Sequence, residues 1–483
     1  MLVNSFIFWG FFLIVLIPYY TFLRKSNKAQ NWWLLIASYF FFGYSELKML
    51  PVIALATVVF YFLGIQIEKD NDSNPKRASL LTTLGIVLGV GILIYFKYLN
   101  FLIDQFAALF SSLGMQVNRG AFTIVMLLGV SYFTFKLMGY LIQVHRGEIK
   151  ASRDPVAFGV FVAFFPALLA GPIDRAGEFL PQMKINRTFT YNNMAEGARR
   201  VLWGMFMKMC VSDRLCGYID AVFDNWQMHS GVSLVIASFF YFIQAYTDFC
   251  GYSNMAIGVG QMMGIKMREN FNRPYVVQSL TELWRRFHMS LTTWITDYIF
   301  MPLNVKFRNL GMWGIYLATL INMVVVGAWH GANWTYVVFG IYHGILVSVI
   351  TALERPRKKF EKKHHLVGKW YYKYPRILFT WFLFALGTTI FRSESVSAFS
   401  GICGKILSGG GSIFTDGLFD ALIMGMTSFA IVLFKDWKDE EKKNIHLLHS
   451  NKLWVRILSF SLIVVYIILF AELDGKSFIY YQF

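Results

Sequence analysis

The chain has 483 residues and a formal net charge of +17. Apolar residues make up 56% of it and charged residues only 15%, whereas a soluble domain carries about a quarter charged residues. This composition excludes a string of soluble domains and predicts one integral membrane domain over residues 1–483. Lysines and arginines lie in short loops between apolar runs, where they orient membrane spans and meet anionic headgroups, so the charge does not indicate a nucleic-acid partner.

Apolar stretches that predict membrane segments follow one another along the whole chain. In chain order they lie near residues 1–23, 32–45, 49–67, 79–96, 98–113, 121–144, 156–171, 201–223, 231–250, 311–329, 334–353, 377–391, 417–434 and 454–471. Several are shorter than the roughly 20 residues of a full span, and those near 98–113 and 156–171 are candidates for re-entrant or interfacial segments. We therefore expect an all-α polytopic protein with ten to twelve crossings.

Charged loops and the N-terminus predict the orientation. The first run has no basic stretch before it and ends at a basic cluster from Arg24, so we expect a retained span and not a cleaved signal peptide. Residues 354–376 carry nine Lys or Arg against two acids, and residues 435–456 are also basic, so both segments are expected in the cytoplasm. On this pattern both termini lie outside.

The four cysteines are scattered, and none forms a close pair with histidines at metal-ligand spacing. We expect neither a disulfide nor a metal site. The cysteines are Cys210, Cys216, Cys250 and Cys403.

The sequence Trp329-His330-Gly331-Ala332-Asn333-Trp334 places a titratable histidine between two long apolar runs. Residues 311–328 and 335–353 contain no Asp, Glu, Lys or Arg, and each is about long enough to cross a bilayer. An ionisable group at membrane depth is costly unless it faces a cavity or a partner, so His330 is a candidate catalytic residue at an outer turn. The alternative is a structural histidine that holds two helices together.

The densest polar stretch, residues 268–308, lies just before this pair of runs. Pro274 and Pro302 exclude one unbroken helix through it. The spacing of apolar residues predicts a helix from Thr281 to Trp294, with His288 on its apolar side.

This stretch has two interpretations. One is an amphipathic helix on the cytoplasmic surface. The other is a basic, aromatic mouth for an anionic cytosolic ligand such as a coenzyme. The candidate donor-binding residues are then Trp284, Arg285, Arg286, Asn272 and Arg273, with Asn333 of the outer turn as a further one.

Asp248 interrupts the apolar run 231–250. An isolated carboxylate in such a run needs an arginine or a cluster of hydrogen-bond donors. We interpret Asp248 as a structural residue that braces the core helices.

Four ordered motifs resemble the membrane-bound O-acyltransferase family, and within it the bacterial alginate O-acetyltransferase-like branch. They are Tyr246-x-Asp248-Phe249-x-Gly251-Tyr252-Ser253-x-Met255-Ala256-Ile257-Gly258, Glu269-Asn270-Phe271-Asn272-Arg273-Pro274-Tyr275, Glu282-x-Trp284-Arg285-Arg286-Phe287-His288-x-Ser290-Leu291, and the Trp329 to Trp334 motif. Residues 36–44 and 165–175 also look like this branch. The resemblance runs from about residue 30 to 350; Cys250 departs from it, because the branch often has a serine there.

The resemblance implies a helical bundle around a tunnel or funnel that leads to the essential histidine of the family. That histidine matches His330, and the second histidine of the branch matches His288. The motif-bearing core would span about residues 30–353, followed by C-terminal helices in 354–483. The chemistry agrees independently, because acyl transfer to a hydroxyl needs a base and an imidazole titrates near neutral pH.

The resemblance also implies a function. The protein would move an acetyl group from cytosolic acetyl-CoA, its donor substrate, to hydroxyls of an envelope polysaccharide, with an extracytoplasmic SGNH-type partner and no bound cofactor. One alternative within the family is D-alanyl transfer to teichoic acid from a carrier protein. An alternative of another class is a transporter or flippase with a buried histidine relay, which should show internal repeats, and the sequence shows none.

Overall fold

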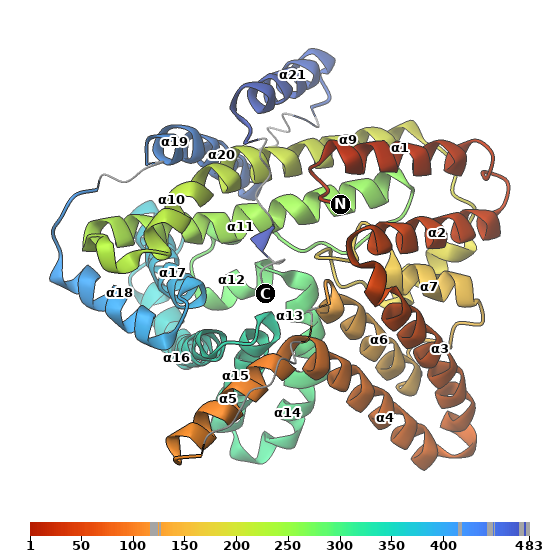
Figure 1. The fold of residues 1–483 in the computed structure, drawn as a ribbon. Coiled ribbons are helices and arrows are strands. Elements are labelled where there is room, and N and C mark those ends of the chain that lie inside the picture. Colours follow the sequence, from red (N-terminus) through yellow and green to blue (C-terminus); the bar gives the residue numbers. More distant parts are fainter. Residues whose placement is uncertain are drawn as a thin grey trace. The chain divides into compact units, whose positions relative to one another are not determined.

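The computed structural model describes residues 1–115, 124, 127–413, 418–441, 448, 450–472 and 478–479. The chain is 79% helical, and these residues contain no strand (Figure 1). A helix satisfies its backbone polar groups internally, as a bilayer requires. The predicted all-α class is confirmed.

Eight segments are long and apolar enough to cross a membrane, which supports a multi-pass membrane protein. They are Asn27–Ser73, Pro75–Ser112, Gly231–Met262, Met312–His330, Trp334–Lys363, Trp370–Arg392, Leu418–Glu440 and Leu453–Phe470. The first two each contain more than one helix. The count of ten to twelve crossings stays a prediction, as do the tunnel and the side on which each terminus lies.

The chain forms two compact units. Unit 1 comprises Met1–Val201 and Ala256–Arg268, and unit 2 comprises Leu202–Met255 and Glu269–Phe483. The chain passes between the units within α9 (Tyr191–Met205), within α11 (Gly231–Met262) and between Arg268 and Glu269. All candidate site residues belong to unit 2.

Unit 1 contains the N-terminal helices. They are α1 (Phe6–Tyr20), α2 (Asn27–Glu46), α3 (Leu50–Ser73), α4 (Pro75–Leu93), α5 (Leu99–Ser112), α6 (Val130–His145), α7 (Pro155–Ala163) and α8 (Ala176–Phe179). Glycines on α4 bring it close to α6, since a Cβ at Gly85 would lie 2.3 Å from Cδ1 of Leu141. Such small residues are typical of helix contacts in membranes.

The expected re-entrant region near 156–171 is not one continuous helix. α7 has nine residues, too few to cross a bilayer, and residues 164–175 continue it as buried, non-helical backbone. Backbone of this kind is tolerated at membrane depth only where protein covers it. Asp174 anchors its end by accepting a hydrogen bond from the Arg268 backbone N–H at 2.9 Å, and burial raises the pKa of Asp174 to about 6.

Unit 2 contains the remaining helices, with short 3-10 and π segments between them. The α-helices are α10 (Asp213–Phe223), α12 (Leu280–Arg286), α13 (Met289–Ile295), α14 (Met301–Lys306), α15 (Met312–His330), α16 (Trp334–Lys363), α17 (Trp370–Arg392), α18 (Val396–Ser408), α19 (Leu418–Asp420), α20 (Met426–Glu440) and α21 (Leu453–Phe470). The segments used below are the π-helical η4 (Phe206–Ser212) and the 3-10 helix η6 (Pro274–Val276).

The helices α15 and α16 form a tight antiparallel pair that places His330 at their connecting turn (Figure 1). A Cβ at Gly327 would lie 2.1 Å from the carbonyl oxygen of Tyr336, and one at Gly340 would lie 2.5 Å from that of Met323. These glycines therefore let the two backbones touch. The short distance between the two helices near the turn thus depends on these glycines.

Candidate active site

His330 is the last residue of α15, and only 6% of it is exposed. Its ring lies edge-on to Phe391, with the centroids 5.1 Å apart. Asn333 caps the next helix, because its Oδ1 accepts a hydrogen bond from the Thr335 N–H and its Nδ2 donates to the carbonyl of Glu394. The outer-turn motif thus fixes the backbone on which the histidine sits.

The structure breaks the helix predicted from Thr281 to Trp294. α12 ends at Arg286 and α13 begins at Met289. Between them His288 has a left-handed backbone, with φ +47°. This conformation is uncommon for a residue other than glycine and needs support from its surroundings. The prediction of one helix was wrong at this point.

Asn270 supplies that support. Its carbonyl accepts a hydrogen bond from the Met289 N–H at 2.8 Å, and its side-chain Oδ1 accepts from the N–H and the hydroxyl of Ser290 at 3.2 and 2.7 Å. Its Nδ2 donates to the Ser253 hydroxyl on α11 at 3.1 Å. One buried asparagine therefore satisfies the first turn of α13 and ties it to a core helix.

A second contact closes the clamp on the other side of His288. The Asn272 N–H donates to the Arg286 carbonyl, the last of α12, at 2.9 Å. Two of the recognised motifs, 269–275 and 282–291, are thus joined by hydrogen bonds on both sides of the histidine. In this arrangement Asn272 acts through its backbone, while its side chain is exposed and accepts a bond from Arg273.

The two candidate catalytic histidines come together in one site. The ring centroids of His288 and His330 are 6.4 Å apart, and His288 is 1% exposed. Phe249 and Trp329 pack on the His288 ring, at 4.5 and 5.5 Å between centroids. Burial lowers the pKa of His288 well below its ordinary value, and the neighbouring His330 lowers it further, so its imidazole is neutral at pH 7.

The C-terminal segment forms part of this wall, which the sequence did not indicate. The ring of Phe478 stacks on Tyr252 at 4.6 Å and meets Phe249 at 5.9 Å. The next residue, Ile479, donates its N–H to Oδ2 of Asp248 at 2.9 Å. The end of the chain, for which an outer location is predicted, lies outside the described residues from position 480 onward.

Asp248 lies in a buried charge cluster. Lys208 Nζ is 2.6 Å from Asp248 Oδ1 and 2.7 Å from Asp213 Oδ1, and the Ser212 hydroxyl donates to Asp248 at 3.1 Å. All three charged side chains are at most 5% exposed. Each of the two carboxylates thus has the same buried lysine as its ion-pair partner. The cation beside Asp248 is a lysine on a separate helical segment, η4, and the sequence did not identify this lysine as its partner.

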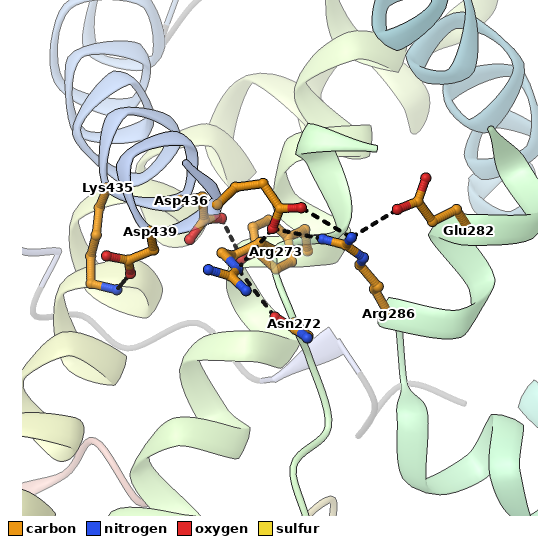
Figure 2. Close-up of polar contacts among 9 residues, drawn as sticks. Asn272, Arg273, Glu282, Arg286, Lys435, Asp436 and Asp439 are labelled. Atoms are coloured by element: carbon orange, nitrogen blue, oxygen red, sulfur yellow. Dashed lines mark hydrogen bonds and ion pairs between the residues drawn. The ribbon is translucent and has the colours of Figure 1, made fainter. Parts of the chain in front are cut away.

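The candidate donor-binding arginines have different surroundings, and Figure 2 shows those of Arg286 and Arg273. Arg286 donates to both carboxylate oxygens of Glu440 on α20, at 2.9 and 3.1 Å, and to Glu282 at 2.8 Å. Arg273 Nε lies 3.4 Å from the same Glu440. Arg285 is exposed and has no carboxylate within 4.0 Å in the described part of the chain. Arg286 and Arg273 already share a carboxylate, so Arg285 is the cation left available.

Trp284 is buried at 7% exposure against a third histidine, which the sequence reading missed. Its Nε1 donates to Nδ1 of His343 at 3.4 Å. His343 is fully buried on α16 and packs on Gly387 of α17, where a Cβ would lie 2.3 Å from its Nε2. The sequence could have indicated His343, because it is a histidine within the uncharged run 335–353. Trp334, unlike the buried Trp284, is 52% exposed.

Comparison with known proteins decides the family. Residues 148–391 match the model of MBOAT, the membrane-bound O-acyltransferase family. The chain belongs to this family. The predicted resemblance and the predicted enzyme class, an acyltransferase, are confirmed.

Individual relatives agree with this assignment. A probable alginate O-acetylase AlgI of Pseudomonas putida is 34% identical over 413 residues, which cover 85% of this chain and 81% of that protein. A peptidoglycan O-acetyltransferase of Helicobacter pylori is 28% identical over 95% of this chain and 92% of its own. A teichoic acid D-alanyltransferase of Streptococcus thermophilus is 30% identical, but over only 52% of this chain and 63% of its own.

The charge cluster around Lys208 gives a prediction for stability. Lys208→Met leaves two buried carboxylates without their cation, which costs about 3–5 kcal/mol when one partner of a buried pair is removed. We expect a clear fall in the midpoint of thermal unfolding of the detergent-purified protein, measured by tryptophan fluorescence.

The matched control is Lys435→Met, which removes a lysine from a partly exposed i,i+4 pair with Asp439. Such pairs contribute about 0.3–0.5 kcal/mol, so its midpoint should stay near that of the wild type. Adding Asp213→Asn and Asp248→Asn to Lys208→Met should restore part of the loss. Equal midpoints for the two single variants would contradict a role of the cluster in stability.

Proposed function

We propose that this acyltransferase is an O-acetyltransferase of a cell-envelope polysaccharide and that His330 is its general base. The observation that carries the proposal is the pairing of His330 with a neutral His288 in one buried site walled by aromatic rings. A base must be unprotonated to take the proton of an acceptor hydroxyl, and burial favours the neutral imidazole. Apolar walls also exclude water, which protects a thioester donor from hydrolysis.

The names of the relatives support both the group and the acceptor. Relatives that align with most of this chain are named for O-acetylation of alginate or peptidoglycan. The teichoic acid D-alanyltransferases align with about half of it. Acetyl transfer to a sugar hydroxyl is therefore better supported than D-alanyl transfer, and an acyltransferase family gives no support to a transporter.

For the donor we propose cytosolic acetyl-CoA, which binds through its phosphates to the basic face of α12. Arg285 is the residue best placed for this contact, since it is exposed and carries no carboxylate partner. Arg286 and Arg273 would reach a phosphate only by giving up Glu440, so we assign them first to holding the loop. We assign a positioning role for the motif loops to the three remaining candidates, Trp284, Asn272 and Asn333.

For the acceptor side we propose an SGNH-type partner outside the membrane, which receives the acetyl group near the outer turn. Loop charge supports the orientation. The start of α17 and the end of α20 line one cavity, so these two helix ends lie beside each other. This agrees with the prediction that 354–376 and 435–456 share one side.

The first test is His330→Ala. Loss of a general base should lower the rate of acetyl transfer by roughly two to four orders of magnitude. The measurement is release of free coenzyme A from acetyl-CoA by purified protein supplied with the SGNH-type partner and an acceptor polysaccharide. Folding is checked by elution volume and unfolding midpoint.

His343→Gln is the matched control, because it alters an equally buried histidine of the same unit that has no place at the paired site. We expect this variant to keep most of its activity if it folds. An unfolding midpoint like the wild type together with near-normal transfer by His330→Ala would refute the assignment of the base.

His288 is tested with two substitutions. His288→Ala removes a ring packed between Phe249 and Trp329, whereas His288→Gln keeps volume and a hydrogen-bonding amide. If His288 positions the donor or relays a proton, both variants lose activity, and KM for acetyl-CoA rises or the pH profile of kcat moves. A purely structural role would be rescued by glutamine, with wild-type kinetics and pH profile.

The donor contact is tested with Arg285→Glu. Turning an attractive charge into a repulsive one should raise the Kd for coenzyme A at least tenfold at low salt, with less effect at high salt. Arg308→Glu is the control, because it makes the same charge change on an exposed residue of the same stretch. Equal effects of both variants would reduce the contact to general surface charge, and no effect of Arg285→Glu would remove Arg285 from the donor site.

A further inference from the structure

A cavity of about 320 Å³ lies between α17, α20 and η6, all in unit 2. Its walls are aromatic and aliphatic, and Lys373 is the charged residue that lines it. Tyr275 forms part of the wall and belongs to the motif segment that holds His288. Trp381 donates its indole N–H to the Tyr275 carbonyl at 2.8 Å, so the cavity wall is firmly joined to this segment.

The cavity, called the groove below, has exposed apolar side chains among its lining residues. Leu378 on α17 is 60% exposed, and Phe434 on α20 is 48% exposed. Both lie within candidate membrane spans. Exposed apolar side chains on a span face hydrocarbon, so the groove borders the apolar part of the bilayer.

One end of the groove carries positive charge. Lys373 lies in the first turn of α17, and Lys438 lies near the end of α20 with its Nζ 4.5 Å from the ring centroid of Trp437, which lines the groove. Neither lysine has a carboxylate within 4.0 Å among the described residues. The neighbouring Glu440 is already bound by Arg286 through both of its oxygens.

An indole donor adds to these charges. The Nε1 of Trp437 is buried and finds no acceptor in the part of the chain that the structure describes. Two lysines without a carboxylate within 4.0 Å among the described residues, and a buried N–H donor, lie beside an apolar groove. Together they match the charge and the hydrogen-bond needs of a phosphate on a hydrocarbon chain. The predicted sidedness puts this end at the cytoplasmic surface, where anionic lipids attract lysines.

We propose that this groove binds an anionic phospholipid. Its phosphate lies between Lys373 and Lys438, and one acyl chain runs along the groove over Tyr275 and Trp381. The proposal is independent of the acyl-transfer chemistry, because it concerns a separate cavity.

The test measures lipid adducts of the full-length, detergent-purified protein by native mass spectrometry. The probe is dioleoyl-phosphatidylglycerol, compared with dioleoyl-phosphatidylcholine and with soluble glycerol 3-phosphate. The double variant Lys373→Gln/Lys438→Gln should weaken phosphatidylglycerol binding about fivefold for each lysine, or about 25-fold in all. It should weaken phosphatidylcholine less, because the choline cation offsets the charge of that lipid's phosphate.

The matched control is Lys362→Gln/Lys369→Gln, which removes two exposed lysines of the same basic segment that do not line the groove. It should bind phosphatidylglycerol like the wild type. Leu378→Trp keeps the charge but fills the groove from an exposed position, and it should weaken both lipids.

Three results would overturn the proposal. Equal losses in the two double variants would indicate general surface attraction. Unchanged phosphatidylglycerol binding in both Lys373→Gln/Lys438→Gln and Leu378→Trp would exclude the groove. Displacement of phosphatidylglycerol by glycerol 3-phosphate at equal concentration would indicate a site for a free phosphate and not for a lipid.

Discussion

The hydrogen bonds of Asn270 are the constraint on which the candidate site depends. The apolar residues of 281–294 have the spacing of one continuous helix, and in such a helix His288 would lie on the apolar side. Asn270 satisfies the N-terminal groups of a second helix that starts one residue later, at Met289. These bonds stabilise the strained backbone conformation of His288, which turns this residue toward His330.

The membrane setting explains why this arrangement uses so many buried polar contacts. A polar group in an apolar bundle cannot turn to water, so each one must find a partner within the protein. Lys208 forms ion pairs with both Asp213 and Asp248, and Asp248 in turn accepts the N–H of Ile479. The same carboxylate that balances charge in the core thereby seats the C-terminal segment against the wall of the histidine site.

Composition and pattern predicted the features that depend on local sequence. The all-α class follows from long apolar runs, and His330 stands out because two uncharged runs flank it. The partners did not follow, because each comes from a distant part of the chain. Asn270 breaks a helix it is not part of, Lys208 reaches Asp248 from another helix, and Glu440 on α20 binds Arg286. Periodicity carries no information about such contacts.

The recognised motifs divide into residues that form the reactive site and residues that hold its backbone. Of those described, His288 and His330 meet in the site, whereas Asn270 and Asn272 hold the loop and Asn333 caps the next helix. Relatives named for acetyl transfer and for D-alanyl transfer both align with this chain. The likeness to both kinds of relative therefore does not by itself identify the acyl group. Selection of donor and acceptor must then rest on the walls around the histidines and on the surfaces that receive the two substrates.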